Sequence, residues 1–441
     1  ILIVLLIYPI QFSNSKDKIN NSYCEQTNYK NYNINNSQTI SSIKIDVKNK
    51  KKWFRNSFQV ISSKSLNNSI SKKNKKRYKA DIIIYFNNDK FCKFNAKIRL
   101  HGDFRDHIKL VNGNFLSSLD IKIDNGHANS FTNFKLFLPE TRFGVNEILI
   151  TELFRELKIL SPKTFFVNAE INGIESKYLF QEKIVKEMLE KNLKREGPIF
   201  EGLEDSVNSD FIFTRIFLTR IVNSKWILKN KNNEIISFKS FNNLNKSYLA
   251  GESGFDRRFF IDHKFLNQDL EKFRVFEPIL YSIVYPHGLG KNNRKFFYNI
   301  LSGEFEPIYY DGDIKKITDF KYKENSEISK LIHPFIIKNS KFALKKLREI
   351  SIENFYKKNQ KNLINLSQNE VSEFFKNIEY NLIFLSNLKY SDLNFSKSLK
   401  NTFSKIDNNE KLVIAFKDQK IIYVCDKSFS NCYFEVINDI F

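Results

Sequence analysis

Two aspartates one residue apart, Asp311 and Asp313, are the residues of this chain best suited to hold a metal ion. They follow the β-compatible residues 307–310, and Gly312 between them permits a tight bend or a positive φ. Two carboxylates at the end of a buried strand repel each other, and a divalent cation removes that cost. Mg²⁺ in phosphoryl-transfer sites is typically held by one or two carboxylates. The spacing predicts a magnesium site, although Asp-Gly-Asp alone is more often a polar turn.

Four further segments carry charged or imidazole side chains beside turns. They are residues 99–107 (Arg-Leu-His-Gly-Asp-Phe-Arg-Asp-His), 178–183 (Tyr-Leu-Phe-Gln-Glu-Lys), 195–200 (Arg-Glu-Gly-Pro-Ile-Phe) and 287–294 (His-Gly-Leu-Gly-Lys-Asn-Asn-Arg). Each also has a plainer interpretation. Glu182 at the start of a helix stabilises the helix dipole, and His101 and His107 around a glycine turn are more often hydrogen-bonded or surface residues. Asn292 and Asn293 are equally typical of a turn.

The elements that position these residues are predicted from apolar periodicity. Alternation predicts an antiparallel β-rich lobe with strands over residues 43–47, 80–86, 94–100, 119–123 and 134–138. Helical spacing of apolar residues predicts helices over residues 145–157, 184–193 and 207–228. Hairpins are expected over residues 165–181, around Asn172-Gly173, and over residues 295–310. The five segments lie within these predicted elements or in the turns beside them.

The remaining stretches have different patterns. Residues 229–275 are expected to be loop-rich, and residues 325–390 to be helical, with Ser367 and Glu370 in a capping box. Residues 410–440 alternate like strands, and Cys425 and Cys432 flank a turn there, which suits a hairpin disulfide in an exported protein. Cys24 can be free or paired with the distant Cys92.

The first 12 residues form an apolar run that is shorter than the ~20 residues needed to span a bilayer. The run matches the apolar part of a signal peptide or signal anchor, and residues 13–40 have the composition of a flexible tether. We therefore expect export to the periplasm or cell envelope, with membrane contact only through the N-terminal segment. The net charge of +22 suggests an anionic partner, but no zinc-finger spacing or dense basic helix indicates nucleic-acid binding.

Taken together, the five segments resemble the spore-coat protein H (CotH) kinase-like family, an atypical protein-kinase-like group, over about residues 80–315. A strand that enters a Gly-Asp turn matches residues 99–106, and an Asn-Gly hairpin that runs through a Tyr-rich strand to a Glu matches residues 171–182. An Arg-x-Glu-Gly-Pro-Ile motif of a related branch is close to residues 195–199. An Asn-containing segment and a strand that enters Asp-x-Asp match residues 292–293 and 311–313.

The resemblance implies transfer of the ATP γ-phosphate to a Ser or Thr hydroxyl or to another acceptor in the cell envelope, with Mg²⁺ or Mn²⁺. It implies that Asp311 is the first metal ligand and Asp313 the second acid. Asn292 or Asn293 is then the neutral metal ligand that kinases often use. The partner is a protein or an envelope polymer, and we expect the chain to be a monomer.

Other roles implied by the resemblance are less complete. Glu182 positions a phosphate-binding lysine or a metal, as a Lys–Glu pair does in protein kinases, and Arg294 neutralises phosphate charge. The phosphate-binding lysine has no motif of its own here, and Lys122 and Lys135 are candidates by position. His287 occupies the place near the metal asparagine where family members carry a catalytic aspartate. The alternative is therefore a catalytically inactive envelope protein that binds an anionic polymer or a partner protein.

The expected architecture is an α+β, kinase-like two-lobed domain over residues 41–325. A β-rich lobe over residues 41–140 packs on a mixed lobe over residues 141–325. A helical extension over residues 326–400 and a β segment over residues 401–441 follow.

Overall fold

A computed structural model describes residues 39–63, 68–87, 90–202, 219–251, 261, 263–267, 269–284, 286–290, 293–322, 332–388, 412–416, 421–425 and 432–436. The predicted leader and nearly all of the predicted tether lie outside these residues, as do Cys24 and Asn292. Within the described residues, no helix is both long and apolar enough to cross a bilayer.

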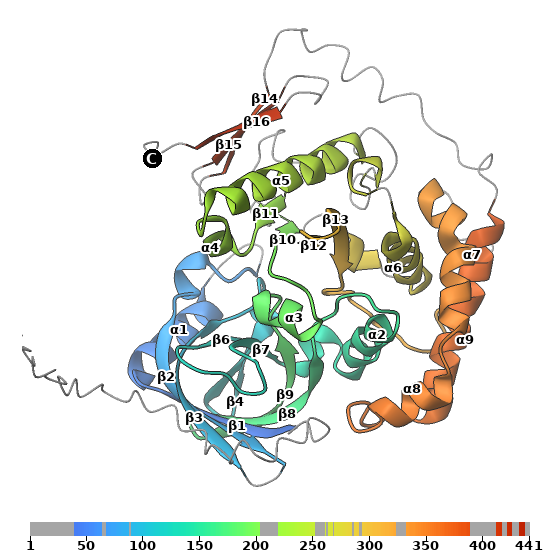
Figure 1. The fold of residues 1–441 in the computed structure, drawn as a ribbon. Helices are drawn as coiled ribbons and strands as arrows, with labels where there is room; N and C mark the ends of the chain where they lie inside the picture. The colour runs from blue at the N-terminus through green and yellow to red at the C-terminus, as the bar shows by residue number, and fades with distance from the viewer. Residues whose placement is uncertain are drawn as a thin grey trace, which may run out of the picture.

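Seven strands from the first half of the chain close into a barrel (Figure 1). In spatial order they are β1 (Ile40–Val47), β2 (Tyr78–Phe86), β3 (Phe91–Leu100), β6 (Leu119–Ile123), β7 (Asn133–Phe137), β9 (Ile174–Glu182) and β8 (Thr164–Ile171). Neighbours are antiparallel except β1 and β8, which pair in parallel and close the ring.

Alternation gives the barrel strands an apolar inner face. The outer face is mostly polar, but Phe137 of β7 and Leu179 of β9 are apolar there and pack into the core formed with the helices. In β2, Ala80, Ile82 and Ile84 are buried in the barrel core, whereas Lys79 and Asp81 on the same strand are exposed. Shifting the register by one residue would turn the apolar side chains out to water, so the alternation also specifies the pairing. The outer face of β3, β6, β7 and β9 is therefore where polar side chains gather.

Two small elements cover the barrel between its strands. Helix α1 (Lys50–Ser62) follows β1 and packs Trp53 edge-on against Tyr78, with ring centroids 5.3 Å apart. A two-stranded ribbon of β4 (Ile108–Val111) and β5 (Asn114–Ser117) connects β3 to β6 along the chain. Short helical turns are η2 (Lys72–Asn74), η3 (Arg105–His107) and η4 (Pro139–Arg142).

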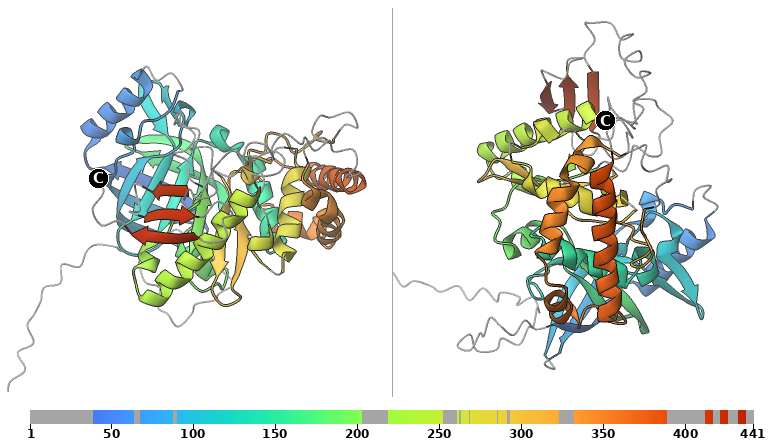
Figure 2. Two further views of the ribbon diagram at one scale, coloured as in Figure 1. Left: turned by 90° about the horizontal axis from the view of Figure 1, so that it is seen from above. Right: turned by 90° about the vertical axis from the view of Figure 1, so that its right-hand side faces the viewer.

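A second sheet and its helices lie beside the barrel (Figures 1 and 2). The sheet has the order β11 (Thr219–Ile221), β10 (Ile199–Gly202), β12 (Lys295–Asn299) and β13 (Glu304–Ile308). Its companions are α2 (Val145–Glu156), α3 (Lys186–Lys191), α4 (Ser224–Ile227), α5 (Lys231–Gly251), η7 (His263–Phe265), α6 (Glu271–Ser282) and η8 (Pro286–Leu289). An isolated bridge from Leu160 to Ile308 ties β13 to the segment that leads into β8.

The C-terminal part is helical and then returns to strands. Three helices follow, α7 (Pro334–Arg348), α8 (Ile352–Asn359) and α9 (Gln368–Asn387). Helices α7 and α9 pack against α6, and α8 packs against α9, in one apolar core (Figure 1). Ser367 and Glu370 form the predicted capping box at the start of α9. A sheet of β14 (Leu412–Phe416), β15 (Ile421–Cys425) and β16 (Cys432–Val436) follows, with Cys425 opposite Cys432 in register.

Two element predictions were wrong. The helix expected over residues 207–228 is, where described, the strand β11 followed by the single turn α4. The loop-rich interpretation of residues 229–275 fails because α5 and the start of α6 lie there. Helix α5 contains five asparagines, which lower its intrinsic propensity. Packing of Phe241, Leu244 and Tyr248 into a buried cluster outweighs that cost.

The α+β class is confirmed, with a β-rich N-terminal region and a helical C-terminal part. The β-rich region differs from the kinase-like lobe that was expected, because it is a closed barrel and not an open kinase-like sheet. Strands β8 and β9, which come from beyond residue 140, complete it. The hydrophobic alternation predicted the strands individually, but the parallel pairing of β1 with β8 joins residues more than 120 positions apart and has no local signal.

Candidate functional site

The turn after β13 holds both predicted metal ligands in an unusual backbone conformation. Asp311 and Asp313 each have a left-handed φ of 54°, a region that aspartate tolerates better than most residues but at some cost. Gly312, which permits a tight bend or a positive φ, does not have a positive φ here and is needed for space. A Cβ on Gly312 would lie 2.6 Å from Tyr309 Oη, and the Gly312 N–H donates to that oxygen at 3.1 Å.

The segment around η8 brings two more predicted residues to this turn. His287 Nδ1 lies 3.1 Å from the Asp311 carbonyl oxygen and 3.9 Å from Asp311 Oδ1. The Asn293 amide nitrogen lies 3.1 Å from His287 Nε2. Gly288 allows this approach, because a Cβ there would lie 3.2 Å from the Tyr310 carbonyl oxygen. His287 therefore lies between Asn293 and Asp311 at this turn.

Arg142, at the end of η4, forms an ion pair with the Asp311 carboxylate. Burial alone would raise the pKa of Asp311, but Arg142 and then His287 outweigh it and lower that pKa. For Asp313, burial and the nearby Asp311 charge together raise the pKa, against His287 and Lys315. The two carboxylates are therefore held in different environments. Asp311 is paired with the buried Arg142, whereas Asp313 forms a longer ion pair with the exposed Lys315, whose Nζ lies 3.8 Å away.

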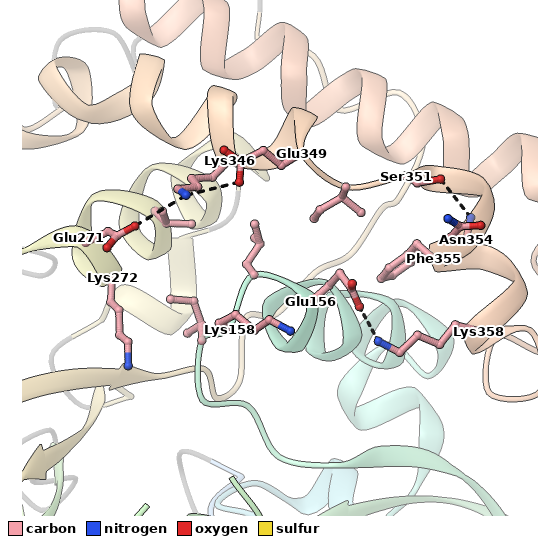
Figure 3. Close-up of a pocket in the computed structure, with 14 residues that line it drawn as sticks. Glu156, Lys158, Glu271, Lys272, Lys346, Glu349, Ser351, Asn354, Phe355 and Lys358 are labelled. Atoms are coloured by element: carbon pink, nitrogen blue, oxygen red, sulfur yellow. Dashed lines mark hydrogen bonds and ion pairs between the residues drawn. The ribbon is translucent and has the colours of Figure 1, made fainter. Parts of the chain in front are cut away.

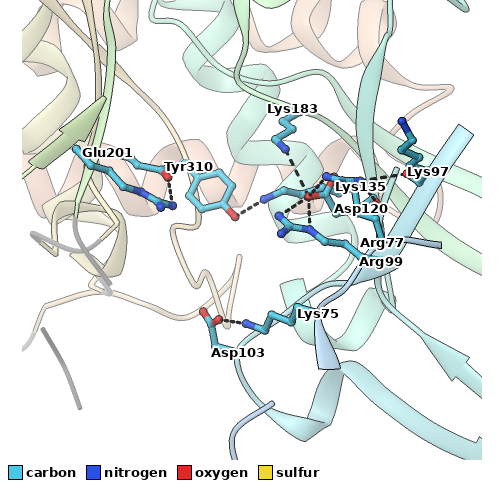
Figure 4. Close-up of polar contacts among 11 residues, drawn as sticks. Lys75, Arg77, Lys97, Arg99, Asp103, Asp120, Lys135, Lys183, Glu201 and Tyr310 are labelled. Carbon is cyan, nitrogen blue, oxygen red and sulfur yellow. Dashed lines mark hydrogen bonds and ion pairs between the residues drawn. The ribbon is translucent and has the colours of Figure 1, made fainter. Parts of the chain in front are cut away.

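Tyr310 links this turn to the barrel wall. Its hydroxyl accepts hydrogen bonds from Lys135 Nζ at 2.8 Å and from Arg142 Nη2 at 3.1 Å. Lys295 Nζ lies 4.4 Å from the centroid of the Tyr310 ring, and Lys135 Nζ lies 4.8 Å from it. Figure 4 shows the ring between Glu201 on one side and Lys135 on the other. Three cations therefore surround the residue that precedes Asp311.

The barrel wall supplies a row of charged side chains around one buried carboxylate. Asp120 of β6 is 1% exposed and pairs with Arg77 at 3.1 Å, Arg99 at 2.7 Å and Lys183 at 3.4 Å (Figure 4). Lys135 of β7 is the cross-strand neighbour of Asp120, as Arg99 of β3 is on the other side. Burial opposes ionisation of Asp120, but Lys183, Arg77, Arg99 and Lys135 outweigh it and lower its pKa.

Positive charge exceeds negative charge across this region. Lys135 lowers the pKa of three carboxylates, Asp120, Asp311 and Glu201, so it lies within electrostatic reach of all of them. Glu201 in turn pairs with Lys295 and Arg220. We call the set formed by Arg77, Arg99, Lys135, Arg142, Lys183, Arg220 and Lys295 the cationic cluster. It contains seven basic groups and faces three paired carboxylates.

Three other predicted residues, Glu182, Arg294 and Lys122, lie apart from the turn. Glu182 is buried at the end of β9, where it accepts a hydrogen bond from the Lys163 N–H and pairs with Lys191 at 2.9 Å. Arg294 is buried in an ion pair with Glu277 of α6 at 2.7 Å. Lys122 lies exposed on β6, two residues from Asp120 and outside the cationic cluster. Asn292 lies outside the described residues. Of the two candidate lysines, only Lys135 reaches the site.

His101 and His107 belong to the hydrogen-bonded surroundings of the barrel end. His107 Nδ1 lies 3.0 Å from Ser118 Oγ, and Gly102 (φ 103°) lets the His107 ring pack against the turn. Burial lowers the pKa of His107 to about 4. Burial, then Lys135 and Arg142, lower the pKa of His101 well below its ordinary value. Both rings are therefore neutral at pH 7, which fits the plainer interpretation.

The donor set at the turn suits one kind of metal site. Among the described residues, no group of three or more His, Cys, Asp or Glu side chains lies close enough to hold a metal by itself. Mg²⁺ does not require such a group, because it keeps several waters and takes one or two carboxylates together with substrate phosphates. Asp311, Asp313 and the Asn293 amide provide that smaller set. The residues present therefore fit a metal that arrives with a phosphate ligand.

A separate pocket of about 550 Å³ lies between α2, α6, α7 and α8 (Figure 3). Its floor is apolar, and its rim carries paired charges such as Lys346 with Glu349 and Lys358 with Glu156. None of the residues predicted from the sequence lines it. The chemistry-bearing residues are therefore gathered at the barrel wall and the turn after β13, and not in this pocket.

Glu147 of α2 connects the site to pH-dependent stability. Its carboxylate accepts hydrogen bonds from Tyr309 Oη at 2.6 Å and Gln181 Nε2 at 3.0 Å. Burial raises the pKa of Glu147 to about 7, against the opposing effects of Arg142 and Tyr309. The folded state therefore keeps a proton that the unfolded chain releases near pH 4.5, so the wild-type free energy of unfolding falls as the pH rises from about 4.5 to 7.

Replacing Glu147 by glutamine removes this titration. We expect the unfolding free energy of Glu147→Gln, relative to wild type, to rise by up to roughly 3 kcal/mol between pH 4.5 and pH 8. Urea denaturation of both proteins at the two pH values measures the change, and all other titrating groups cancel in the difference. A difference that does not change with pH would contradict the burial of an ionisable Glu147.

Sequence reasoning missed most of the cationic cluster. Asp120 was treated as the polar residue of an alternating strand, which is the usual outcome for an outward position. The charged residues of the cluster are neighbours across adjacent strands, not along a single strand, so one strand read by itself does not indicate them. Only the register that pairs Arg99, Asp120 and Lys135 side by side shows three charged residues at one level of the wall. Arg142 and Tyr310 reach this level from other segments.

No protein-family model matches this chain, and no curated protein matches it. The resemblance to the spore-coat protein H kinase-like family therefore stays a prediction from the order and spacing of its motifs. The function has to be argued from the cationic cluster and the turn after β13.

Proposed function

We propose that this chain is a metal-dependent phosphotransferase that moves the γ-phosphate of ATP to a Ser or Thr hydroxyl or to another acceptor of the cell envelope. The observation that carries the proposal is the contact of Lys135 and Arg142 with Tyr310, directly before Asp311. It sets a wall of cations beside a pair of carboxylates. Phosphoryl transfer needs both features, because the phosphate oxygens and their metal ions must be neutralised together.

The cationic cluster supplies the charge for a triphosphate. Lys135, Arg77 and Arg99 present ammonium and guanidinium groups at one level of the barrel wall, and guanidinium groups bind phosphate in a bidentate way. The side chain of Arg142 is only 9% exposed, and its Nε has no hydrogen-bond partner among the described residues. A buried N–H of this kind is costly unless a ligand accepts from it. These features support anion binding at this position.

Asp311, Asp313 and Asn293 are the residues that would hold the metal. A bound Mg²⁺ or Mn²⁺ supplies neutralisation of the charge on the phosphate oxygens. His287 is exposed beside Asp311 and Asn293, so it is placed to accept the proton of the attacking hydroxyl. The acceptor oxygen forms a bond to the γ-phosphorus, the bond to the β–γ bridging oxygen breaks, and ADP leaves with that oxygen.

The cellular setting of the proposal is the envelope. Cys92 is disulfide-bonded, and disulfides persist in oxidising compartments such as the periplasm and the cell surface. The apolar residues 1–12 support the same location. The closed barrel is not the fold of a kinase lobe, so the fold does not support the kinase proposal. The proposal depends on the residues of the site and on the motif order that resembles the spore-coat protein H kinase-like family.

A non-catalytic envelope protein is the second candidate, favoured by one observation. The Asp311 carboxylate is already paired with Arg142, as in a structural ion pair. Such a protein would use the cationic cluster to hold an acidic glycan or polyphosphate without transfer. Its affinity for the polymer would fall steeply with salt and would not change in Asp311→Asn.

The test is transfer of the γ-phosphate from radiolabelled ATP, followed as ADP release and as label on the protein, with Mg²⁺ or Mn²⁺. We expect Asp311→Asn to lose about a hundredfold or more of the rate, because a metal contributes several kcal/mol of transition-state stabilisation. Asp319→Asn is the matched control, since Asp319 has a φ of 53° but is exposed away from the site. Wild-type protein without metal-dependent ADP release would contradict the enzyme proposal, and equal rates in both variants would contradict the assigned site.

A further inference from the structure

The segment from residue 47 to residue 80 contains no acidic residue and twelve lysines and arginines. It includes α1, the turn η2 and the start of β2. Arg77 belongs to the cationic cluster, and Lys48, Lys50 and Lys75 pair with aspartates outside the segment. The segment still carries more positive than negative charge, with Lys51, Lys52 and Arg55 exposed on α1, and an excess of this kind attracts anions.

Helix α1 also exposes two phenylalanines one turn apart. Phe54 is 52% exposed and Phe58 is 56% exposed, whereas Trp53 and Val60 on the other face are buried against the barrel. Trp53 and Val60 therefore provide the buried contacts that attach the helix to the barrel. In all views α1 lies at the outer edge of the molecule (Figures 1 and 2). Large aromatic side chains that packing does not require indicate an interaction surface when they are contiguous.

The two phenylalanines are part of a larger apolar surface. The Phe54 ring centroid lies 4.8 Å from that of Phe115 on β5. Phe115 is the cross-strand partner of Leu110 on β4, and Leu110 is 56% exposed. Phe115 itself is buried, at 9% exposed. We call the exposed Phe54, Phe58 and Leu110, together with the buried Phe115 that joins α1 to the ribbon, the aromatic patch. It crosses from α1 to the β4–β5 ribbon, so it is not a chance single exposed residue.

Basic side chains border the aromatic patch. Lys51, Lys52 and Arg55 are exposed on α1 between and beside the two phenylalanines, and none of them forms an ion pair with a described residue. Asn56 of α1 and Asn74 of η2 exchange hydrogen bonds at 2.9 and 3.2 Å, which holds the lysines of η2 beside α1. The surface thus combines exposed phenylalanines with a basic border.

We propose that this surface binds an anionic phospholipid bilayer. Phe54 and Phe58 enter the boundary between head groups and acyl chains, and Lys51, Lys52 and Arg55 contact the lipid phosphates. Amphipathic surfaces with aromatic and basic residues bind membranes in this way, and each Lys or Arg near an anionic leaflet adds to the affinity. A soluble acidic polymer would use the basic residues alone. The exposed phenylalanine pair favours a bilayer, which is the anionic partner that also has an apolar phase.

The experiment is flotation of the full chain with vesicles of phosphatidylcholine alone and of phosphatidylcholine mixed with phosphatidylglycerol. The measured quantity is the ratio of the two affinities, because apolar residues elsewhere contribute to both. We expect a preference for the anionic vesicles that falls about tenfold in Lys51→Glu/Arg55→Glu. A matched control is Lys341→Glu/Lys345→Glu, two exposed lysines of α7.

The aromatic part is tested with Phe58→Ser and with Phe54→Ser/Phe58→Ser. Each is expected to weaken binding to anionic vesicles severalfold, while Leu193→Ser and Leu228→Ser, which alter residues 95% and 84% exposed elsewhere, leave it unchanged. The single variant Phe58→Ser keeps the Phe54–Phe115 contact, so it tests membrane binding even if the double variant unfolds the helix. Binding that is unaffected by both phenylalanine variants, or that soluble dextran sulfate matches in affinity, would overturn the proposal. Phosphate transfer is not measured here, so failure of this proposal leaves the proposed enzyme function standing.

Discussion

Replacing Asp120 by alanine is expected to lower the free energy of unfolding by about 3 kcal/mol, the low end of the usual cost of removing one partner from a buried charge pair. The carboxylate is 1% exposed and is the shared partner of Arg77, Arg99 and Lys183. These three side chains are between 25% and 37% exposed, so water solvates their charges once the carboxylate is removed. This solvation reduces the loss of stability. Urea denaturation at pH 7 measures the effect.

Asp81→Ala is the matched control for this prediction. Asp81 is also an aspartate of the barrel wall, but it is 54% exposed and pairs only with Lys48. Exposed pairs contribute at most about 1 kcal/mol, so Asp81→Ala should change stability little. Inorganic pyrophosphate should raise the melting temperature of Asp120→Ala more than that of wild type, because the anion replaces the missing carboxylate. Equal losses in both variants would show that Asp120 does not organise the cations.

The Asp120 prediction also has a pH sign. The pKa of Asp120 is lowered in the folded state, so its contribution is complete above the ordinary aspartate pKa and is lost only as the pH falls below it. The gap between wild type and Asp120→Ala should therefore be constant from pH 5 to pH 8. This is opposite to Glu147, whose contribution changes inside that window.

Replacing Lys135 by methionine is expected to weaken ATP binding about ten- to a hundredfold, the range for losing a hydrogen bond to a charged group. Lys135 is only 9% exposed and donates to Tyr310 at 2.8 Å, so its ammonium is fixed between the barrel wall and the turn that carries Asp311. Methionine keeps the length and apolar stem of the lysine and removes only its charge. Calorimetric titration with ATP and Mg²⁺ gives the dissociation constant.

Lys122→Met is the control for Lys135→Met. Both lysines were equal candidates from the sequence, and both lie on the outer face of adjacent barrel strands. Lys122 is exposed and outside the cationic cluster, so its replacement should change ATP affinity less than about twofold. Comparable losses in the two variants would mean that the barrel attracts ATP by overall charge and has no defined phosphate site.

The comparison of Lys122 with Lys135 also shows where sequence reasoning ends. Strand alternation identified β6 and β7 and put both lysines on the outer face, which is correct. Tyr310 and Arg142 contact that face at Lys135, and they lie 175 and seven residues after Lys135 in the chain. Long-range packing of this kind leaves no periodic signal. The turn at Asp311 and Asp313 was found because its residues are adjacent in sequence.

The barrel was missed for a related reason. Each of its strands has a local pattern, and the hairpin around Asn172-Gly173 was predicted correctly. Closure depends on the parallel pairing of Ile43 with Ala169, which nothing in either strand specifies by itself. Helix α1 was missed because only Trp53, Asn56, Ser57 and Val60 are buried, and two of these are polar. The same property leaves Phe54 and Phe58 exposed.

The most direct test of the proposed function is electron paramagnetic resonance of Mn²⁺ mixed with the protein and ATP. ATP itself binds Mn²⁺ and weakens the free-ion signal, so the measured quantity is the further decrease that the protein causes at the same concentrations of Mn²⁺ and ATP. We predict that wild type lowers the signal below that of Mn²⁺ and ATP alone, and that Asp311→Asn loses this further decrease whereas Asp319→Asn keeps it. Bound Mn²⁺ that is the same in Asp311→Asn as in wild type, or wild type that binds none with ATP, would contradict the account.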